Sequence, residues 1–252
     1  MWPPEHAFLT GASSGIGRAL SILLAEAGCG GLTLVGRNAS RLAETADMCR
    51  SKGAETRTLL MDVRDREGMV LAAGDTFDRR PVDLVIANAG VSGTLEGDPR
   101  AVLDINIGGV LNSVEPFIEP MCARGQGQIA IMSSIAGFKG FPNAPLYCAS
   151  KAAVRSYGEA LDARLRPLGV AVTVLCPGFI ETPLTAVNAF PMPLIMSSEA
   201  AARRLLGGIE RRKARVAFPL RMYAIVRLLE CLPTGLANTL LARTAGRRAA
   251  KE

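Results

Sequence analysis

The chain has 252 residues, of which 49% are hydrophobic and 21% are charged. This length suits one large α/β domain with a sizeable core, and the composition excludes an intrinsically disordered chain. The formal net charge is +6, and no apolar run approaches the roughly 18 residues of a membrane-spanning helix. Residues 1 to 6 also lack the basic and apolar segments of a signal peptide. We therefore expect a cytoplasmic protein without a transmembrane helix.

The cysteines and the single histidine limit the chemistry further. None of the six cysteines forms a Cys-x-x-Cys pair, so we expect them to be reduced and mostly buried. His6 is expected to be an ordinary surface residue near the terminus. With one histidine, a Ser-His-Asp triad is hard to build, and we expect no metal site. Acid–base chemistry then falls to tyrosine, lysine or carboxylates.

Strand-like and helix-like segments alternate along the chain, and no change of composition marks a linker. Short apolar runs without polar alternation suit strands that are buried on both faces. This pattern predicts an α/β fold, a doubly wound parallel sheet of about seven strands with helices on both faces, in one domain over residues 1–252. The expected strands are Ala7–Leu9, Leu32–Val35, Thr56–Met61, Leu84–Ala87, Ile129–Met132, Val170–Leu175 and Val216–Phe218.

The first expected strand leads directly into a glycine-rich segment, Thr10 to Gly17, and then into a helical pattern from Arg18. A strand, a glycine turn and a helix in this order are the context of a dinucleotide phosphate site. Without side chains in the way, backbone N–H groups can approach a pyrophosphate at the positive end of the helix. The simpler alternative is a tight strand-to-helix turn.

Tyr147 and Lys151 are four residues apart in an expected helix, so both side chains lie on one face. A cation beside a phenol can lower the pKa of the phenol and make it a usable acid or base. Taken alone this pair is weak evidence, because most such pairs are solvated helix faces. Ser134 lies 13 residues before the tyrosine and is a further candidate.

These segments together resemble the short-chain dehydrogenase/reductase family over about residues 6 to 219. The resemblance implies a Rossmann-type fold and an oxidoreductase that interconverts a carbonyl and a secondary alcohol with a nicotinamide cofactor. The motifs that carry it are Thr10 to Gly17, Asn88-Ala89-Gly90, Asn106-Ile107-Gly108-Gly109, Ser134, Tyr147-Cys148-Ala149-Ser150-Lys151 and Pro177-Gly178-Phe179-Ile180-Glu181-Thr182.

The resemblance also implies roles for four catalytic residues. Tyr147 gives a proton to the carbonyl oxygen as hydride reaches the carbonyl carbon, and Lys151 lowers the pKa of the phenol and binds the nicotinamide ribose. Ser134 donates a hydrogen bond to the substrate oxygen. Asn106 holds a water that links Lys151 to solvent; a local helix kink is the alternative.

The charge after the second expected strand indicates which cofactor is preferred. A carboxylate there would accept hydrogen bonds from the ribose 2′-hydroxyl of NAD, but this chain has Gly36 and Arg37. Gly36 leaves room for a 2′-phosphate, and Arg37 offers it a planar fork of donors. Ser14 stands where NADP-dependent members carry a basic residue, so the prediction of NADP(H) depends mainly on Arg37. The alternative interpretation of Arg37 is a solvated charge at the end of the strand. The expected cofactor-binding residues are Gly11, Ser13, Ser14, Gly15, Ile16, Gly17, Arg37, Asp62, Val63, Asn88, Ala89, Gly90, Tyr147, Lys151, Pro177, Gly178, Ile180 and Thr182.

The C-terminal fifth of the chain is the least family-like segment. Residues 201–252 contain 12 Lys and Arg and three acids, a net charge of +9. Residues 220–252 are expected to form a helical extension that either packs over the substrate pocket or between subunits, or touches an anionic membrane. Nucleic-acid binding is not expected, because the cations are not interleaved with aromatic residues.

The substrate is expected to be a small carbonyl or alcohol of lipophilic character, such as a hydrophobic ketone, a sterol or an acyl chain. This expectation comes from the apolar segment Pro183 to Met196, which includes Phe190 and is expected to be a flexible loop or lid. A homodimer or homotetramer is expected from the family resemblance. The alternative function is a nonenzymatic NADP(H)-sensing or scaffold protein, against which the intact catalytic residues argue.

Overall fold

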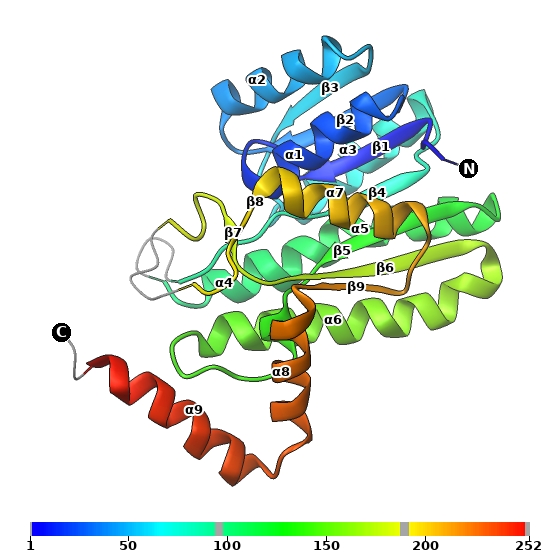
Figure 1. Ribbon diagram of the computed structural model, residues 1–252. Coiled ribbons are helices and arrows are strands. Elements are labelled where there is room, and N and C mark those ends of the chain that lie inside the picture. Colours follow the sequence, from blue (N-terminus) through cyan, green and yellow to red (C-terminus); the bar gives the residue numbers. More distant parts are fainter. Residues whose placement is uncertain (1, 94–97, 187–191, 250–252) are drawn as a thin grey trace.

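The computed structural model describes residues 2–93, 98–186 and 192–249, with side chains up to residue 242. A parallel sheet of seven strands crosses the molecule in the order β3-β2-β1-β4-β5-β6-β9 (Figure 1). The order reverses between β1 and β4, so the loops that follow these two strands diverge and leave room between them. The predicted fold class is confirmed. The strands are β1 (His6–Thr10), β2 (Gly31–Gly36), β3 (Glu55–Leu60), β4 (Leu84–Ala87), β5 (Gly127–Met132), β6 (Val170–Pro177) and β9 (Arg215–Phe218).

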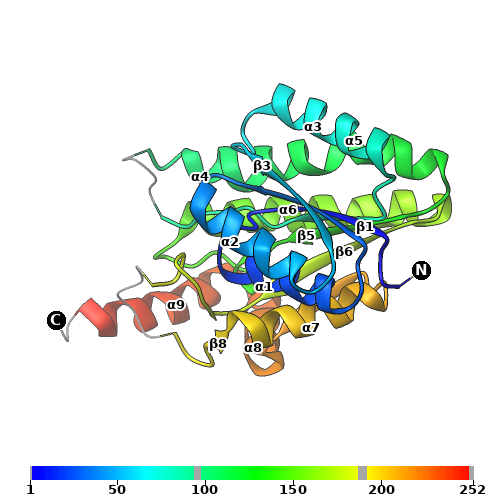
Figure 2. The ribbon, with the colours of Figure 1, turned by 90° about the horizontal axis from the view of Figure 1, so that it is seen from above.

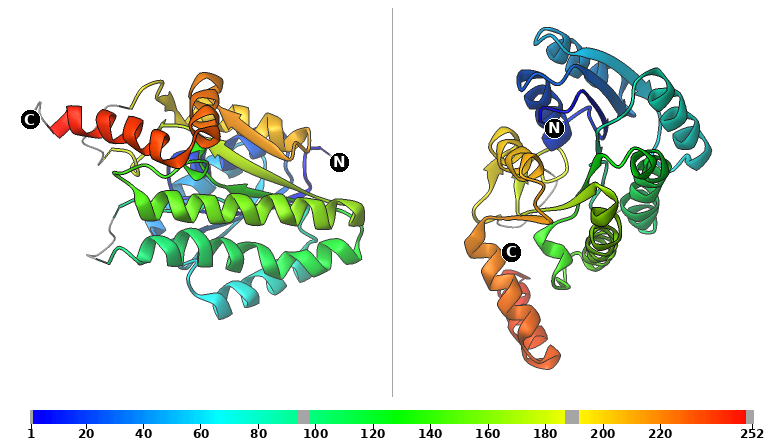
Figure 3. Two further views of the ribbon diagram at one scale, coloured as in Figure 1. Left: turned by 90° about the horizontal axis from the view of Figure 1, so that it is seen from below. Right: turned by 90° about the vertical axis from the view of Figure 1, so that its right-hand side faces the viewer.

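Helices cover both faces of the sheet, as the views from above and from the side show (Figures 2 and 3). Side chains alternate along each strand, so Leu9 packs into the core on one face and Phe8 into the core on the other. The first face is covered by α1 (Gly15–Glu26), α2 (Ala39–Arg50) and α7 (Ser198–Glu210). The opposite face is covered by α3 (Arg66–Arg79), α5 (Gly109–Ala123) and α6 (Pro145–Leu165).

Side-chain caps fix where several of these helices begin. The carboxamide of Asn38 accepts from the Arg41 N–H at the start of α2. Asp65 accepts from the Gly68 N–H at the start of α3. Each cap satisfies a backbone donor that has no partner within its helix, and so stops the helix from starting earlier.

Two segments differ from the sequence-based expectation. Strand β3 is partly exposed, because it lies at the edge of the sheet and is not buried on both faces. The expected loop from Pro183 to Met196 is flanked by a short parallel pair, β7 (Ile180–Glu181) and β8 (Met196–Ser197). Residues 187–191, including Phe190, lie outside the described residues.

The remaining elements are short turns and the C-terminal arm. The short helix α4 (Ala101–Leu103) and a π-helical turn, η1 (Asp104–Gly108), run directly into α5. Two 3-10 turns, η2 (Ile135–Gly137) and η3 (Arg166–Leu168), precede and follow α6. The arm consists of α8 (Leu220–Cys231) and α9 (Thr234–Ala249) and extends away from the sheet beyond β9 (Figure 1). Over the described ranges, every helix is too short or too polar to cross a membrane.

His6 corrects a sequence-based expectation, since it is buried at the amino end of β1. Its Nδ1 lies 3.0 Å from the Arg80 carbonyl oxygen and its Nε2 lies 3.0 Å from Thr33 Oγ1. A carbonyl only accepts, so Nδ1 carries the proton and Nε2 accepts from the threonine. Burial lowers the pKa of His6, which keeps the ring neutral. The six cysteines are free, as expected, and the buried ones are Cys29, Cys49, Cys148 and Cys176.

Candidate active site

The predicted site residues converge at the carboxyl edge of the sheet, on loops that follow successive strands. Strands end together in a parallel sheet, so residues far apart in sequence meet at one edge. Helix α6 adds Tyr147 and Lys151, and the π-helical turn adds Asn106. The strand-end segments are Gly11–Gly17 after β1, Arg37 after β2, Asp62 and Val63 after β3, Asn88–Gly90 after β4, Ser134 after β5, and Pro177–Thr182 at the end of β6.

The glycine-rich turn has the backbone that its sequence predicts. Gly11 and Gly15 have φ angles of +70° and +53°, in the left-handed region that favours glycine. A side chain at Gly17 would overlap the Gly11 carbonyl oxygen, and one at Gly15 would lie 2.9 Å from Thr182. Thr182 is therefore held against the glycine turn, and the segment after β6 closes over the start of α1.

Asn88 joins the ends of β1 and β4. Its Nδ2 donates to the carbonyl oxygens of Thr10 and Gly11, at 3.0 and 3.3 Å. In return, Thr10 Oγ1 accepts from the N–H groups of Asn88 and Ala89. These bonds brace the two central strands. They also fix the path of the backbone into Gly90.

Arg37 and Asp62 lie side by side at the ends of β2 and β3. Arg37 Nη1 is 3.4 Å from Asp62 Oδ2, and about half of the arginine side chain is exposed. Arg64 also binds Asp62, through Nη2 at 2.9 Å and Nε at 3.1 Å. The side-chain hydrogen bond from Arg64 is the main cause that lowers the pKa of Asp62. The carboxylate therefore stays ionised between two guanidinium groups.

Ser134, Tyr147 and Lys151 meet between η2 and the start of α6. Ser134 Oγ accepts from the Ala136 N–H and donates to the Pro177 carbonyl oxygen at 3.3 Å. The Lys151 Nζ lies 5.7 Å from the centre of the Tyr147 ring and donates to the Met132 carbonyl oxygen at 3.0 Å. The serine, the phenol and the ammonium group are therefore brought together, as the motif predicts.

Burial dominates the proton affinities of this cluster. It raises the pKa of Tyr147, because the phenolate is disfavoured in a dry environment, while a hydrogen bond with Ser134 acts in the opposite direction. Burial also lowers the pKa of Lys151 to about 8. From the sequence, Lys151 is expected to lower the pKa of the phenol. In the structure burial raises that pKa, and a hydrogen bond with Ser134 opposes the rise.

Asn106 is fully buried at the centre of the π-helical turn. Its Oδ1 accepts from the Val91 N–H at 2.8 Å, and its Nδ2 donates to the Val91 carbonyl oxygen and to Ser150 Oγ. A Cβ placed on Gly90 would lie 3.1 Å from Asn106 Oδ1 and 3.4 Å from Lys151 Nζ. Asn106 thus reaches the lysine side of the site, and one lone pair of Oδ1 remains for a further donor. The helix is distorted here into the π-helical turn, which is compatible with both interpretations of Asn106.

Replacing Asn106 by alanine is expected to destabilise the fold by about 2–4 kcal/mol, because this side chain is fully buried and both polar groups of the part-buried Val91 backbone lose their partner. Chemical denaturation in urea measures this loss. Asn112→Ala is the matched control, since that side chain donates to the Val63 carbonyl oxygen at a part-buried position. An equal loss in both variants would contradict the structural role assigned to Asn106.

Several residues that the motifs did not single out organise the site. Ser150 receives the Asn106 amide, Ser133 Oγ donates to the Lys151 carbonyl oxygen, and Thr185 Oγ1 donates to the Ile180 carbonyl oxygen. Ser150 lies within the predicted Tyr147–Lys151 segment and Thr10 opens the glycine motif, so their positions carried a signal. Thr185 and Arg64 stand outside every motif and needed the structure.

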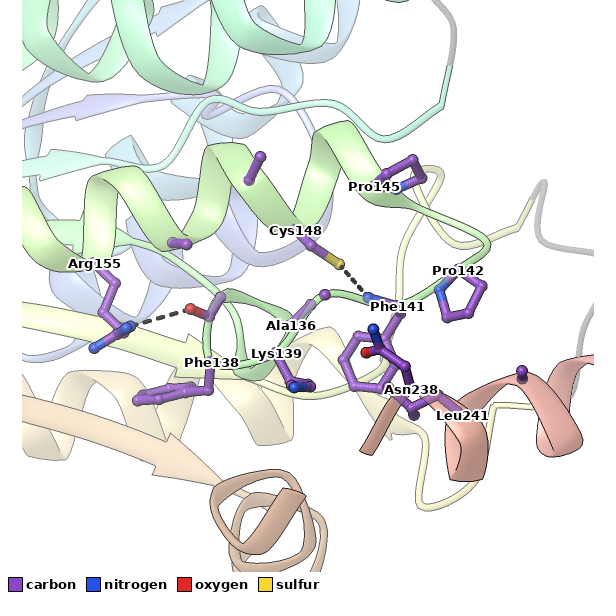
Figure 4. Close-up of a pocket in the computed structure, with 15 residues that line it drawn as sticks. Ala136, Phe138, Lys139, Phe141, Pro142, Pro145, Cys148, Arg155, Asn238 and Leu241 are labelled. Atoms are coloured by element: carbon purple, nitrogen blue, oxygen red, sulfur yellow. Dashed lines mark hydrogen bonds between the residues drawn. The ribbon is translucent and has the colours of Figure 1, made fainter. Parts of the chain in front are cut away.

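A cavity of about 660 Å³ lies between η2, α6 and α9 (Figure 4). Phe138, Phe141, Cys148 and Leu241 are among its lining residues. Cys148 accepts from the Phe141 N–H, and Arg155 donates to the Gly137 carbonyl oxygen (Figure 4). Tyr147 and Lys151 lie outside the lining of this cavity. The arm therefore borders a cavity, together with η2 and α6, whose lining does not include the predicted catalytic tyrosine and lysine.

Comparisons of the sequence show the family to which the chain is similar. A family model described as short chain dehydrogenase matches residues 5–190. A Myxococcus xanthus protein described as an uncharacterized oxidoreductase is 34% identical over 91% of this chain and 93% of its own. A Mycobacterium tuberculosis protein with the same description is also 34% identical, over 93% of this chain and 96% of its own.

Superposition on solved structures confirms the fold. A short chain dehydrogenase/reductase from Burkholderia phymatum in complex with NAD superposes with a TM-score of 0.80 at 27% identity, over 88% of this chain and 92% of that one. A short-chain dehydrogenase from Sphingobium yanoikuyae in complex with NADPH has the same TM-score at 24% identity, over 94% and 95% of the two chains. Proteins similar to this one therefore hold either dinucleotide.

Proposed function

Because the chain belongs to the short-chain dehydrogenase family, we propose that it is an NADP(H)-dependent oxidoreductase that interconverts a carbonyl and a secondary alcohol. The observation that carries this proposal is the meeting of Ser134, Tyr147 and Lys151 beside Gly90, at the end of the sheet where the glycine turn begins α1. In this proposal residues 1–252 act as one domain.

The residues present fit a nicotinamide dinucleotide. The left-handed glycines bring the backbone close to a pyrophosphate at the start of α1, and within the described chain the side chain of the N-cap Ser14 caps none of the first-turn N–H groups. In this proposal Thr182 and the Ile180 backbone hold the carboxamide, Lys151 holds the nicotinamide ribose, and Val63 and Asp62 contact the adenine end of the cofactor. When bound, the cofactor supplies the hydride-transfer chemistry.

The protein supplies the proton and the positioning. Tyr147 keeps its proton at neutral pH, because burial raises its pKa, and so acts as the acid in carbonyl reduction. The single hydroxyl proton of Ser134 is donated to the Pro177 carbonyl oxygen in this structure, and in the proposal it turns to the substrate oxygen. A hydrogen bond with Ser134 also opposes the rise in the pKa of the phenol. Lys151, with a pKa of about 8, holds a proton at neutral pH that it can return toward the phenol of Tyr147. Asn106 positions the lysine side of the site and can hold a water there.

The preference for NADP(H) is proposed from the charges at the end of β2. Two guanidinium groups, Arg37 and Arg64, face the single carboxylate of Asp62, so this corner has a net positive charge. Gly36 packs against Ser13 and Leu42, and the position before Arg37 carries no side chain. A 2′-phosphate would therefore meet cations, and Arg37 can exchange its long 3.4 Å contact with Asp62 for a charge-assisted pair.

Titration with NADPH and NADH, followed by nicotinamide fluorescence, tests the cofactor site. Arg37→Ala is expected to weaken NADPH binding by about tenfold or more and to change NADH binding little, because it removes a donor to the 2′-phosphate. Arg41→Ala is the control, since it removes the same charge from an exposed position four residues away. If the Arg37 variant bound NADPH as tightly as the native protein does, the proposed preference for NADP(H) would be refuted. If the native protein bound neither NADPH nor NADH, the proposed reductase function would be refuted.

A lipophilic substrate is proposed from the segment that follows β6. Leu194 and Ile195 are exposed there, and Met192 and Met196 are half-buried, beside the β7–β8 pair that leads from Ile180. Apolar side chains at the entrance to a reducing site suit a hydrophobic ketone, a sterol or an acyl chain. We also propose a cytoplasmic location and a homodimer or homotetramer.

A further inference from the structure

A second cavity, of about 620 Å³, lies along the edge strand β9, between α7 and the start of α8. We call it the basic groove. Its cationic lining residues are Arg203, Arg204, Arg211, Lys213 and Arg215, and no carboxylate is among the described residues that line it. It is separate from the proposed cofactor site, which follows β1, β2 and β3 at the carboxyl edge of the sheet. The motifs and the comparisons assign nothing to it.

Two of the five cations are held in place by the protein. Arg215 binds Glu159 on α6 and donates to Tyr223 Oη at 3.0 Å. Arg204 lies over the ring of Phe218, 5.7 Å from its centre. These contacts fix the two guanidinium groups at the wall of the groove. Of these two, only Arg215 pairs with a carboxylate within the described residues.

The other three cations, Arg203, Arg211 and Lys213, have no carboxylate partner in the part of the chain that the structure describes. The negative end of α7 accounts for Arg211 and Lys213, which follow its last turn. It does not account for Arg203 and Arg204, which lie in the interior of α7, beyond the reach of the helix end. Like charges lining one cavity repel one another and raise its positive potential. An anion in the groove would remove this repulsion.

The shape of the groove depends on two glycines in α7. Arg203, Gly207 and Arg211 follow one another at intervals of four, so they share one face of the helix. A Cβ at Gly207 would meet nothing within 4 Å, so this position leaves open space between the two arginines. Gly208 lets α7 approach β9, because a Cβ there would overlap Val216. Glycine weakens a helix interior, but at this position it leaves the space between the cations unfilled by a side chain.

We propose that the basic groove binds the phosphate group of an organic phosphate ester that carries two or more negative charges. The cations suit the phosphate, and the apolar wall of Val216, Leu220 and the Tyr223 ring suits an attached organic group. Such a group has two sources, a soluble metabolite or the headgroup of a phospholipid. Helix α8 allows the two sources to be distinguished, because its side chains Leu220, Ile225 and Leu228 are exposed and would contact a lipid surface but not a soluble metabolite.

Calorimetric titration with inorganic pyrophosphate, at low salt and in the presence of excess NADPH, tests the groove. The double variant Arg203→Ala/Arg211→Ala is expected to weaken binding by about tenfold or more, and added salt to weaken it in the native protein. Arg66→Ala/Arg164→Ala is the control, because it removes the same charge from exposed positions on α3 and α6, across the sheet. Binding that the groove variant leaves unchanged, or that NADPH displaces, would overturn the proposal.

Sedimentation with vesicles identifies the source. Vesicles that contain phosphatidic acid are compared with vesicles of phosphatidylcholine alone, using the native protein and the variant Ile225→Ser/Leu228→Ser. If the source is a phospholipid, the native protein must bind the acidic vesicles, and both the groove variant and the α8 variant must bind them less. A soluble source requires pyrophosphate binding that the groove variant alone reduces, without vesicle binding. The proposal fails if neither probe binds. It does not depend on the proposed reductase, because the groove substitutions lie outside the catalytic cluster.

Discussion

Tyr147→Phe is expected to lower the rate of carbonyl reduction by a factor on the order of 10³ and to leave NADPH affinity unchanged. The substitution removes the phenol oxygen of Tyr147 together with its proton. That proton is held at neutral pH, and the phenol is hydrogen-bonded to Ser134. The ring itself stays, so the packing beside Lys151 and the cofactor contacts are kept. Steady-state kinetics and fluorescence titration of the same variant separate the two effects.

Tyr157→Phe is the matched control, because Tyr157 lies ten residues further along the same helix. Its hydroxyl is buried, and no described group hydrogen-bonds it. Loss of this oxygen should leave turnover unchanged and should not destabilise the fold, since an unsatisfied polar group disappears. If the Tyr147 variant kept its turnover, or if both variants lost it equally, the assignment of Tyr147 as the acid would be wrong.

Lys151→Met is expected to have effects of opposite sign on activity and stability. Turnover should fall on the order of 10²-fold, because the lysine no longer orients the ribose or exchanges protons with the phenol side. The free energy of unfolding should rise by about 1–3 kcal/mol at pH 7, because a buried ammonium is replaced by an apolar chain of similar length. The lost hydrogen bond to the Met132 carbonyl oxygen reduces this gain.

The pH dependence identifies the cause of that gain. Lys151 has a pKa of about 8 in the folded chain and 10.5 as its ordinary value. Below pH 8 both states are protonated and the full penalty of burying the charge is present. Between these two values the folded chain is neutral while the unfolded chain still holds a proton, so the folded state gains stability as the pH rises. The advantage of the variant should therefore shrink toward zero by about pH 10.5.

Urea denaturation of the native protein and the variant at pH 7 and pH 10.5 measures this change. Lys52→Met provides the control, since Lys52 is exposed and pairs with Glu26 at the surface. That substitution should give no gain at either pH. An advantage of Lys151→Met that stayed constant with pH would show that packing, rather than the buried charge, explains it.

The parts of the fold that follow from local pattern were predictable. Buried runs such as Leu84–Ala87 are apolar throughout and gave the strand with its observed ends. The glycine turn could be read from sequence, because φ angles such as that of Gly15 demand glycine. The edge position of β3 could not, since exposure depends on which strands pair, and pairing is decided by the whole sheet.

The parts of the site that depend on distant partners were not predictable. His6 was expected at the surface, but Thr33 and Arg80 give its ring two partners in the interior. Arg64 shares Asp62 with Arg37, and only the fold shows that the ends of β2 and β3 are adjacent. The basic groove is a further case. Its cations were visible as a charged C-terminal fifth, but α7 and β9 had to be placed before they lined one cavity.

The π-helical turn at Asp104–Gly108 gives this chain a sensitivity to insertion and deletion that its surroundings lack. A π turn holds one residue more than an α-helical turn, and each residue rotates a helix by about 100°. Loss of one residue here would restore regular α-helical bonding and leave α5 packed on the sheet. It would also turn Asn106 away from Val91 and Ser150. In this stretch the loss of a single codon would therefore remove the bonds that Asn106 makes to the Val91 backbone and also displace Asn106 from the lysine side of the site.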